Sequence, residues 1–271
     1  MLGLVELDLG QLVDERLGLV GRDRRRLLWG GTTGGSRFVP APLPNCAQQP
    51  DPFASLAMPS FGGCDYSPSG NGDDDHNSYQ YKNVTTTVVP NASGVTVFCG
   101  GLEVKNADVT FPSGIYVIKD GSFKIDASGA TVRGEGVVFL FSGANARLYL
   151  RGGGSAILKA PTVAQAAAKA VLAPYAGFLF IDNRNNKPTI ATDISGGGTV
   201  NMQGILYSPS RAVMIGGNGA INQGSTYWSM IADNFYLNGT GDLYMKTDFA
   251  TAAFPDILPK VKRLTRITQT Q

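Results

Sequence analysis

Short apolar runs alternate with small polar residues over the central part of the chain. Clear examples are Ile115–Ile118, Val137–Phe141 and Phe178–Ile181. These runs are apolar at both odd and even positions, which is typical of strands covered on both faces rather than strands with one face in water. The pattern therefore predicts buried β-strands separated by tight turns.

The turns between these runs repeat one pattern, in which several small residues lie between two aliphatic residues. The repeated units are Val104–Val109, Ile125–Val132, Leu150–Ile157, Ile194–Val200, Ile215–Ile221 and Leu237–Leu243. Successive units start 21, 25, 44, 21 and 22 residues apart. We interpret the interval of 44 residues as two turns of about 22, with the Ala-rich stretch Ala164–Ala170 in place of the missing unit. The same stretch has the composition of a short inserted helix.

A fixed period in the low twenties indicates a solenoid. Leucine-rich repeats have a similar length, but they need a regular leucine ladder that this chain lacks. We therefore predict an all-β fold, a right-handed parallel β-helix with about 22 residues per coil. Glycine is expected at its corners, where the backbone adopts positive φ or neighbouring coils approach closely.

The expected solenoid is flanked by segments of different composition. The predicted units are an N-terminal leader, helical or disordered, at 1–45, a Cys-bracketed loop and cap region at 46–99, the parallel β-helix at 100–250, and a basic C-terminal tail at 251–271. The leader has helically spaced apolar residues, but it carries acidic residues where a secretory signal is apolar. No apolar run reaches the ~20 residues of a transmembrane helix. We expect neither a cleavable signal nor a membrane span in this chain.

The composition excludes several kinds of binding site. The 271 residues include 35 Gly, one His and three Cys, with 16% charged residues and a formal net charge of +2. This charge argues against an electrostatic nucleic-acid binder. One histidine excludes a site with two His ligands, and three cysteines cannot form a four-Cys zinc site. We expect no cofactor and no metal.

The three cysteines favour a setting outside the cytoplasm. Disulfides persist there, and a charge-poor, Gly-rich β-fold fits such a setting. Cys64 and Cys99 are the favoured pair, because Cys99 adjoins the first coil and a bridge would hold the loop region over the open end of the solenoid. Cys46 stays free or pairs in place of Cys64. The alternative is three reduced thiols in a cytosolic protein.

A polysaccharide lyase or hydrolase is the alternative that a β-helix raises, and it needs converging carboxylates. The carboxylates of the expected core are predicted mostly in turns, without recurring in phase. These residues are Glu103, Asp108, Asp120, Asp126, Glu135, Asp182, Asp193, Asp233, Asp242 and Asp248. The grouping Asp182–Arg184 is interpreted as a loop salt bridge, and Asp73–His76 as a solvated loop rather than a calcium site.

Aromatic residues are the other candidates for a sugar site, because exposed rings can stack on sugars. They are Tyr227, Trp228 and Tyr236 in the late coils, with Tyr79 and Tyr81 in the Cys-rich part. We expect most of them to fill or cap the core.

Residues from about 51 to 245 resemble the C-terminal β-helical region of TadG-like Flp/Tad pilus-assembly proteins of bacteria. The matching pieces are Asp51–Pro59 with Cys64, Phe98–Leu102, Phe111–Tyr116 with Ile118, Gly121, Leu158–Thr162, Tyr175–Gly177, Gly204–Pro209 and Met230–Asp233. The resemblance implies an envelope or surface protein without enzymatic activity or cofactor, and it supports cysteines paired outside the cytoplasm. Such proteins usually begin with a hydrophobic membrane segment, and residues 1–45 offer nothing comparable.

These observations together predict a non-enzymatic, extracytoplasmic structural or interaction protein of the bacterial envelope. Its role would be in Tad (Flp) pilus assembly or surface adhesion, with pilus or envelope proteins, or a surface glycan, as partners. Two alternatives stay open: a polysaccharide-active β-helix enzyme, and a scaffold that self-assembles through its coil ends.

Overall fold

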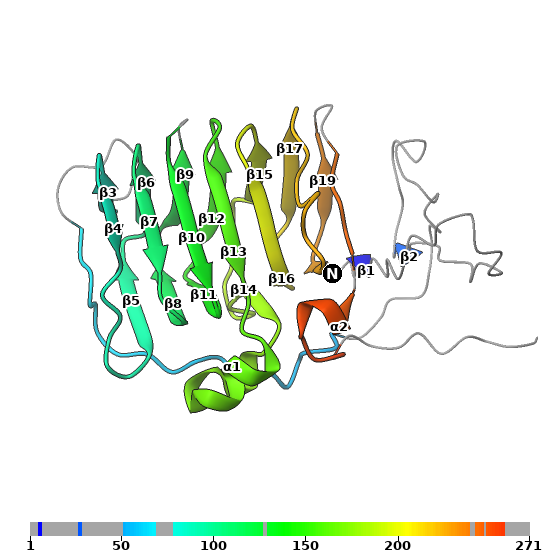
Figure 1. The fold of residues 1–271 in the computed structure, drawn as a ribbon, viewed down its shortest axis with the longest axis horizontal. Helices are drawn as coiled ribbons and strands as arrows, with labels where there is room; N and C mark the ends of the chain where they lie inside the picture. The colour runs from blue at the N-terminus through cyan, green and yellow to red at the C-terminus, as the bar shows by residue number, and fades with distance from the viewer. Residues whose placement is uncertain are drawn as a thin grey trace, which may run out of the picture.

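The computed structural model describes residues 5–6, 27–28, 51–68, 78–126, 129–238, 242–246 and 248–257. Within these residues the chain is a parallel β-solenoid, so the predicted fold class is confirmed (Figure 1). Each regular coil contributes one strand to each of three faces. The coils stack along the length of the molecule, with the first coil and the last coil at opposite ends.

The first face is a seven-stranded sheet whose strands stack in chain order. Its strands are β3 (Tyr79–Lys82), β6 (Leu102–Lys105), β9 (Ser122–Asp126), β12 (Arg147–Arg151), β15 (Thr192–Gly196), β17 (Val213–Gly217) and β19 (Phe235–Leu237). The second and third faces are joined into one ten-stranded sheet, because the long strand β16 (Val200–Ser208) belongs to both. The second face also contains β4 (Thr85–Thr87), β7 (Asp108–Phe111), β10 (Thr131–Glu135) and β13 (Ser155–Lys159). The third face also contains β5 (Val95–Cys99), β8 (Gly114–Lys119), β11 (Val137–Ser142), β14 (Phe178–Asp182) and β18 (Trp228–Ala232).

Neighbouring coils are in register along the solenoid. On the first face Glu103 pairs with Lys124, Lys124 with Tyr149, and Tyr149 with Asp193. Tyr149 and Asp193 are therefore in adjacent coils although 44 residues separate their positions. The interpretation of that interval as two turns is wrong: it is one coil enlarged by insertions.

The enlarged coil has two insertions. One lies between β13 and β14 and contains α1 (Val163–Ala168) and the 3-10 helix η3 (Ala170–Tyr175). The other is the loop 183–191 between β14 and β15. The short helix expected from the Ala-rich composition is confirmed. It begins with a capping box, in which the Thr162 hydroxyl accepts from the Gln165 amide at 3.2 Å and the Gln165 side chain accepts from the Thr162 amide at 3.0 Å.

The solenoid begins earlier in the chain than residue 100. Residues 79–99 already form the complete first coil, with β3, β4 and β5 pairing with β6, β7 and β8. At the other end α2 (Phe249–Ala252) follows the last coil. Phe254 then packs against Tyr227, with ring centroids 5.2 Å apart.

The core is a stack of aromatic rings between the three faces. The Phe139 ring lies 5.2 Å from Phe111, 4.9 Å from Phe123 and 5.7 Å from Phe180, all measured between ring centroids. Because these four rings come from successive coils and from all three faces, each coil buries its side chains against its neighbours rather than by itself.

Glycine at the corners has the two predicted causes. Gly101 adopts a φ of +100°, which other residues rarely adopt. At Gly121 a Cβ would lie 2.0 Å from the carbonyl oxygen of Gly100 in the preceding coil. Both predictions for corner glycines are confirmed.

The described part of the expected leader is a pair of short strands, β1 (Val5–Glu6) and β2 (Leu27–Leu28), which pair antiparallel where the apolar spacing favours a helix. The rest of residues 1–45, Cys46, the run Asp73–His76 and most of the basic tail lie outside the described residues. Among the residues that the structure describes, no helix is both long enough and apolar enough to span a membrane.

Candidate functional site

A segment that precedes the first coil crosses the outside of the third face. We call residues 51–66 the strap, which is the blue chain that passes the strands from the late coils to the first coil in Figure 1. Phe53 on the strap packs edge-on against Phe178, with ring centroids 4.8 Å apart. Because the strap and η3 cover this face, the outward-facing Val117 and Leu140 are fully buried. The expectation that these strands are covered on both faces is confirmed.

Arg184 anchors the strap near its N-terminal end. Its guanidinium donates hydrogen bonds to the carbonyl oxygens of Phe53 at 2.7 Å and Leu56 at 2.8 Å. The predicted loop salt bridge within Asp182–Arg184 is therefore wrong. Asp182 pairs instead with Arg211 at 2.7 Å: Asp182 ends β14, Arg211 lies in the turn that follows the adjacent β16, and both side chains are buried.

Two tyrosines hold the same part of the strap. The Tyr207 hydroxyl donates to the Asp51 carboxylate at 2.6 Å, and the Tyr175 hydroxyl donates to the Ala57 carbonyl at 2.8 Å. Burial raises the pKa of Tyr207, and the neighbouring Asp51 carboxylate raises it further. Burial also raises the pKa of Tyr175. Both hydroxyls therefore stay protonated donors at neutral pH.

The other end of the strap is fixed by the predicted disulfide. Cys64 is bonded to Cys99, the last residue of β5. Next to it, the Asp65 carboxylate accepts from the Val97 amide at 2.8 Å and from the Asn91 side chain at 2.5 Å. The strap is thus tied covalently and by hydrogen bonds to the first coil.

Tyr66 ends the strap and partly fulfils the capping role expected of this region. Its ring stacks on Phe98 with centroids 4.5 Å apart, and its carbonyl accepts from the Cys99 amide at 2.9 Å. It therefore covers both the end of the core and the edge of β5. The remainder of the strap runs along the side of the solenoid rather than over its open end.

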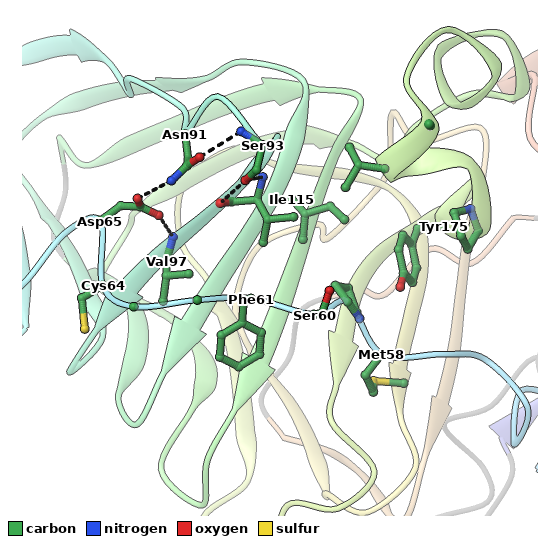
Figure 2. Close-up of a pocket in the computed structure, with 17 residues that line it drawn as sticks. Met58, Ser60, Phe61, Cys64, Asp65, Asn91, Ser93, Val97, Ile115 and Tyr175 are labelled. Carbon is green, nitrogen blue, oxygen red and sulfur yellow. Dashed lines mark hydrogen bonds between the residues drawn. The ribbon is translucent and has the colours of Figure 1, made fainter.

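A groove of about 910 Å³ lies between the strap, η3 and the loop before β5. Figure 2 shows Asn91 and Ser93 at one rim, Tyr175 toward the far end, and Ile115 between the Ser93 rim and the strap. The groove surface is a nearly even mixture of polar and apolar atoms. Among the described residues that line the groove, Asp65 is the one with a charged side chain.

Several carboxylates of the coils hold neighbouring coils together through ion pairs. Most lie in strands, so the prediction of turns is wrong for Glu103, Asp108, Asp126, Glu135, Asp182 and Asp193. Several pair with a cation of a neighbouring coil: Glu103 with Lys124 at 3.3 Å, Asp108 with Arg133 at 3.2 Å, and Asp193 with Arg151. Glu103 and Asp193 occupy one row of the first face, with Lys124 and Tyr149 between them.

The aromatic candidates divide as expected between core and surface. Tyr227 and Trp228 are fully buried, which confirms them as core residues. Tyr79 is half-buried and packs on Tyr66 and Phe98. Tyr236 on β19 is 53% exposed and stands apart from the groove.

The strap and its groove were not predicted from the sequence. Two signals point to them in hindsight. Apolar side chains recur within an otherwise Pro-, Ser- and Gly-rich segment, at Phe53, Leu56, Met58 and Phe61. The apolar outer positions of the third face also require a cover that the coils themselves cannot supply.

Comparisons with protein-family models, with characterised proteins and with solved structures find no match to this chain. The resemblance to TadG-like proteins therefore stays a prediction that rests on the sequence motifs.

Proposed function

We propose that this protein is a non-enzymatic, extracytoplasmic structural and interaction protein of the bacterial envelope, of the kind that acts in Tad (Flp) pilus assembly or surface adhesion. The observation that carries the proposal is the disulfide between Cys64 and Cys99. It closes the strap onto the first coil, and such structural bridges persist in oxidising compartments. The sequence resemblance supplies the pilus context.

The architecture supports a binding role in this setting. A solenoid whose coils share one aromatic core is a stiff rod that can present a surface at a fixed position. The strap and the η3 insertion form its most irregular surface, and binding sites concentrate on irregular segments held by a rigid scaffold. We therefore place the interaction surface at the groove beside the strap.

Fractionation of the native host, with thiol trapping, tests the proposal. Cells are sheared, free thiols are blocked at once, and the fractions are immunoblotted on non-reducing gels. We expect the protein in envelope or sheared-appendage material, with a mobility shift that a Cys64→Ser variant abolishes. Cytoplasmic protein with three reactive thiols would contradict the proposal.

A pilus role is tested separately by deletion. Loss of the gene is expected to reduce surface pili or adhesion, and wild-type protein is expected to restore them. A deletion strain with unchanged piliation and adhesion would remove the pilus part of the proposal while leaving the localisation result intact.

A further inference from the structure

We infer that the groove beside the strap binds an extended peptide segment of a partner protein, which pairs through its backbone with strap residues 58–63. The inference rests on the proposed function as an interaction protein and names the class of partner. It follows from four features of the groove: the free backbone of the strap, its fixed ends, the mixed polarity of the lining and its charge.

The strap backbone offers hydrogen-bonding groups that the described part of the chain does not use. At one end the Ala57 carbonyl accepts from Tyr175, and at the other the Asp65 amide donates to the Val97 carbonyl at 3.0 Å. Between them, no hydrogen bond to another described residue involves the backbone of residues 58–63. Pro59 has no amide, so the segment offers five amides and six carbonyls, and free backbone groups of this kind are a template for another strand.

Open space lies beside this backbone. A Cβ placed at Gly62 or Gly63 would meet no atom within 4 Å, so no neighbouring group crowds the strap on the side-chain side of these two residues. The groove of about 910 Å³ adjoins the same residues (Figure 2). At roughly 3.3 Å per residue, residues 58–63 can pair with a peptide of about six residues.

The strap is also held in place before any partner arrives. Arg184 and two tyrosines fix one end, and the disulfide with Asp65 fixes the other. A template fixed at both ends loses little conformational freedom when a partner binds, which favours affinity.

The lining distinguishes a peptide from other occupants. An acyl chain would require a mainly apolar groove, whereas this surface mixes polar and apolar atoms as a peptide backbone with small side chains does. A sugar would require an open aromatic platform, but Tyr175 is only 5% exposed with its hydroxyl bound to Ala57, and Phe61, the other ring in the lining, is partly buried against the core. With Asp65 as the one charged lining side chain, the groove favours a neutral or basic segment.

The test uses defined peptides on the intact, oxidised protein. The probe is an N-acetylated, C-amidated heptapeptide of sequence Lys-Thr-Val-Thr-Val-Thr-Lys, titrated by NMR. In an extended peptide the valine amides point to one edge and the threonine amides to the other. We expect the probe to bind and one of two N-methylated forms, methylated on valines or on threonines, to lose binding. Equal binding by both forms, or no binding of the probe up to about 1 mM, would overturn the inference.

Two matched pairs of variants locate the contact. The amides of Gly62 and Gly63 point to opposite edges of an extended chain, so one of Gly62→Pro and Gly63→Pro removes a donor at the groove, whereas Gly62→Ala and Gly63→Ala keep both donors at positions with room for a Cβ. We expect one of the two proline variants to weaken probe binding by about 3- to 10-fold and both alanine variants to leave it unchanged, because one backbone hydrogen bond is lost. Unchanged binding by both proline variants, when folded, would contradict pairing at this edge. These results do not depend on localisation, so the inference and the proposed function can fail separately.

Discussion

The buried pair of Arg211 and Asp182 makes the sharpest quantitative prediction about the solenoid. Arg211 is 1% exposed and Asp182 is 3% exposed, and their side chains meet at 2.7 Å. The same guanidinium donates to the carbonyl of Ile190 at 2.5 Å and of Ala146 at 2.8 Å. It therefore connects three coil segments that lie far apart in the sequence.

Arg211→Met removes all of these contacts and leaves the Asp182 charge buried. Breaking a buried ion pair in this way costs about 3–5 kcal/mol, and the carbonyls left without a donor add to that cost. We expect the free energy of unfolding to fall by at least about 4 kcal/mol, which corresponds to a fall in melting temperature of roughly 10 °C for a domain of this size.

Arg133→Met is the matched control. Arg133 also pairs with an aspartate of the neighbouring coil, Asp108, at 3.2 Å, but both side chains are more than a third exposed. Such exposed pairs contribute less than about 1 kcal/mol. Urea denaturation of both variants, followed by circular dichroism, gives the comparison. A loss below about 1 kcal/mol for Arg211→Met, or equal losses for the two variants, would refute the reasoning.

The pH dependence of the same variant provides a second check. Burial raises the pKa of Asp182, while the charge and hydrogen bond of Arg211 lower it. Without Arg211 the folded-state pKa rises further above that of the unfolded chain. The penalty is then fully present above the raised pKa. It shrinks as pH falls below that value toward about 4, the ordinary pKa of the unfolded carboxyl, because the folded carboxyl is by then protonated. We expect Arg211→Met to lose more stability at pH 7 than at pH 4.

Three further predictions concern packing, the disulfide and tyrosine ionisation. Gly121→Ala should destabilise the fold by at least about 3 kcal/mol, because its Cβ would meet a backbone oxygen of the preceding coil at 2.0 Å, whereas Gly62→Ala should change stability by less than about 1 kcal/mol. Replacing Cys64 and Cys99 by serine should lower stability by roughly 3–4 kcal/mol from the freed loop, and reductant should have no effect on that variant in thermal melts. Burial strongly raises the pKa of three tyrosines whose rings are fully buried. The stability that depends on their protonated form is therefore present below about pH 10 and is lost as pH rises toward their folded-state pKa, so tyrosinate absorbance and loss of circular dichroism should coincide. These residues are Tyr116, Tyr207 and Tyr227.

The regular part of the fold can be predicted from the sequence because every coil has the same structural requirements. Small residues recur wherever coils approach closely, as at Gly101 and Gly121, and aliphatic residues recur on either side of them. The disulfide is also predicted correctly, although Cys99 ends the first coil rather than adjoining it.

The irregular part cannot be predicted in this way, because its contacts join segments whose sequences do not repeat. Nothing in the sequence near Arg184 indicates that its partners are carbonyls about 130 residues earlier in the chain. The sequence predicts two coils where there is one enlarged coil, for a related reason. The interval of 44 residues equals two periods, so spacing alone cannot distinguish two coils from one coil with insertions.

The two irregular segments depend on each other, and this bears on where function resides. The insertion of the enlarged coil supplies Tyr175, and the loop after β14 supplies Arg184. Both side chains hold the strap, and the strap in turn buries the apolar outer row of the third face. On the first face the outer row is polar at Glu103 and Lys124. A solenoid with a polar outer row on its third face as well would need neither the strap nor the insertion. The chain instead has an apolar face, a strap that covers it and a groove between strap and insertion, and for this reason we place the proposed binding role at the groove rather than on the regular faces.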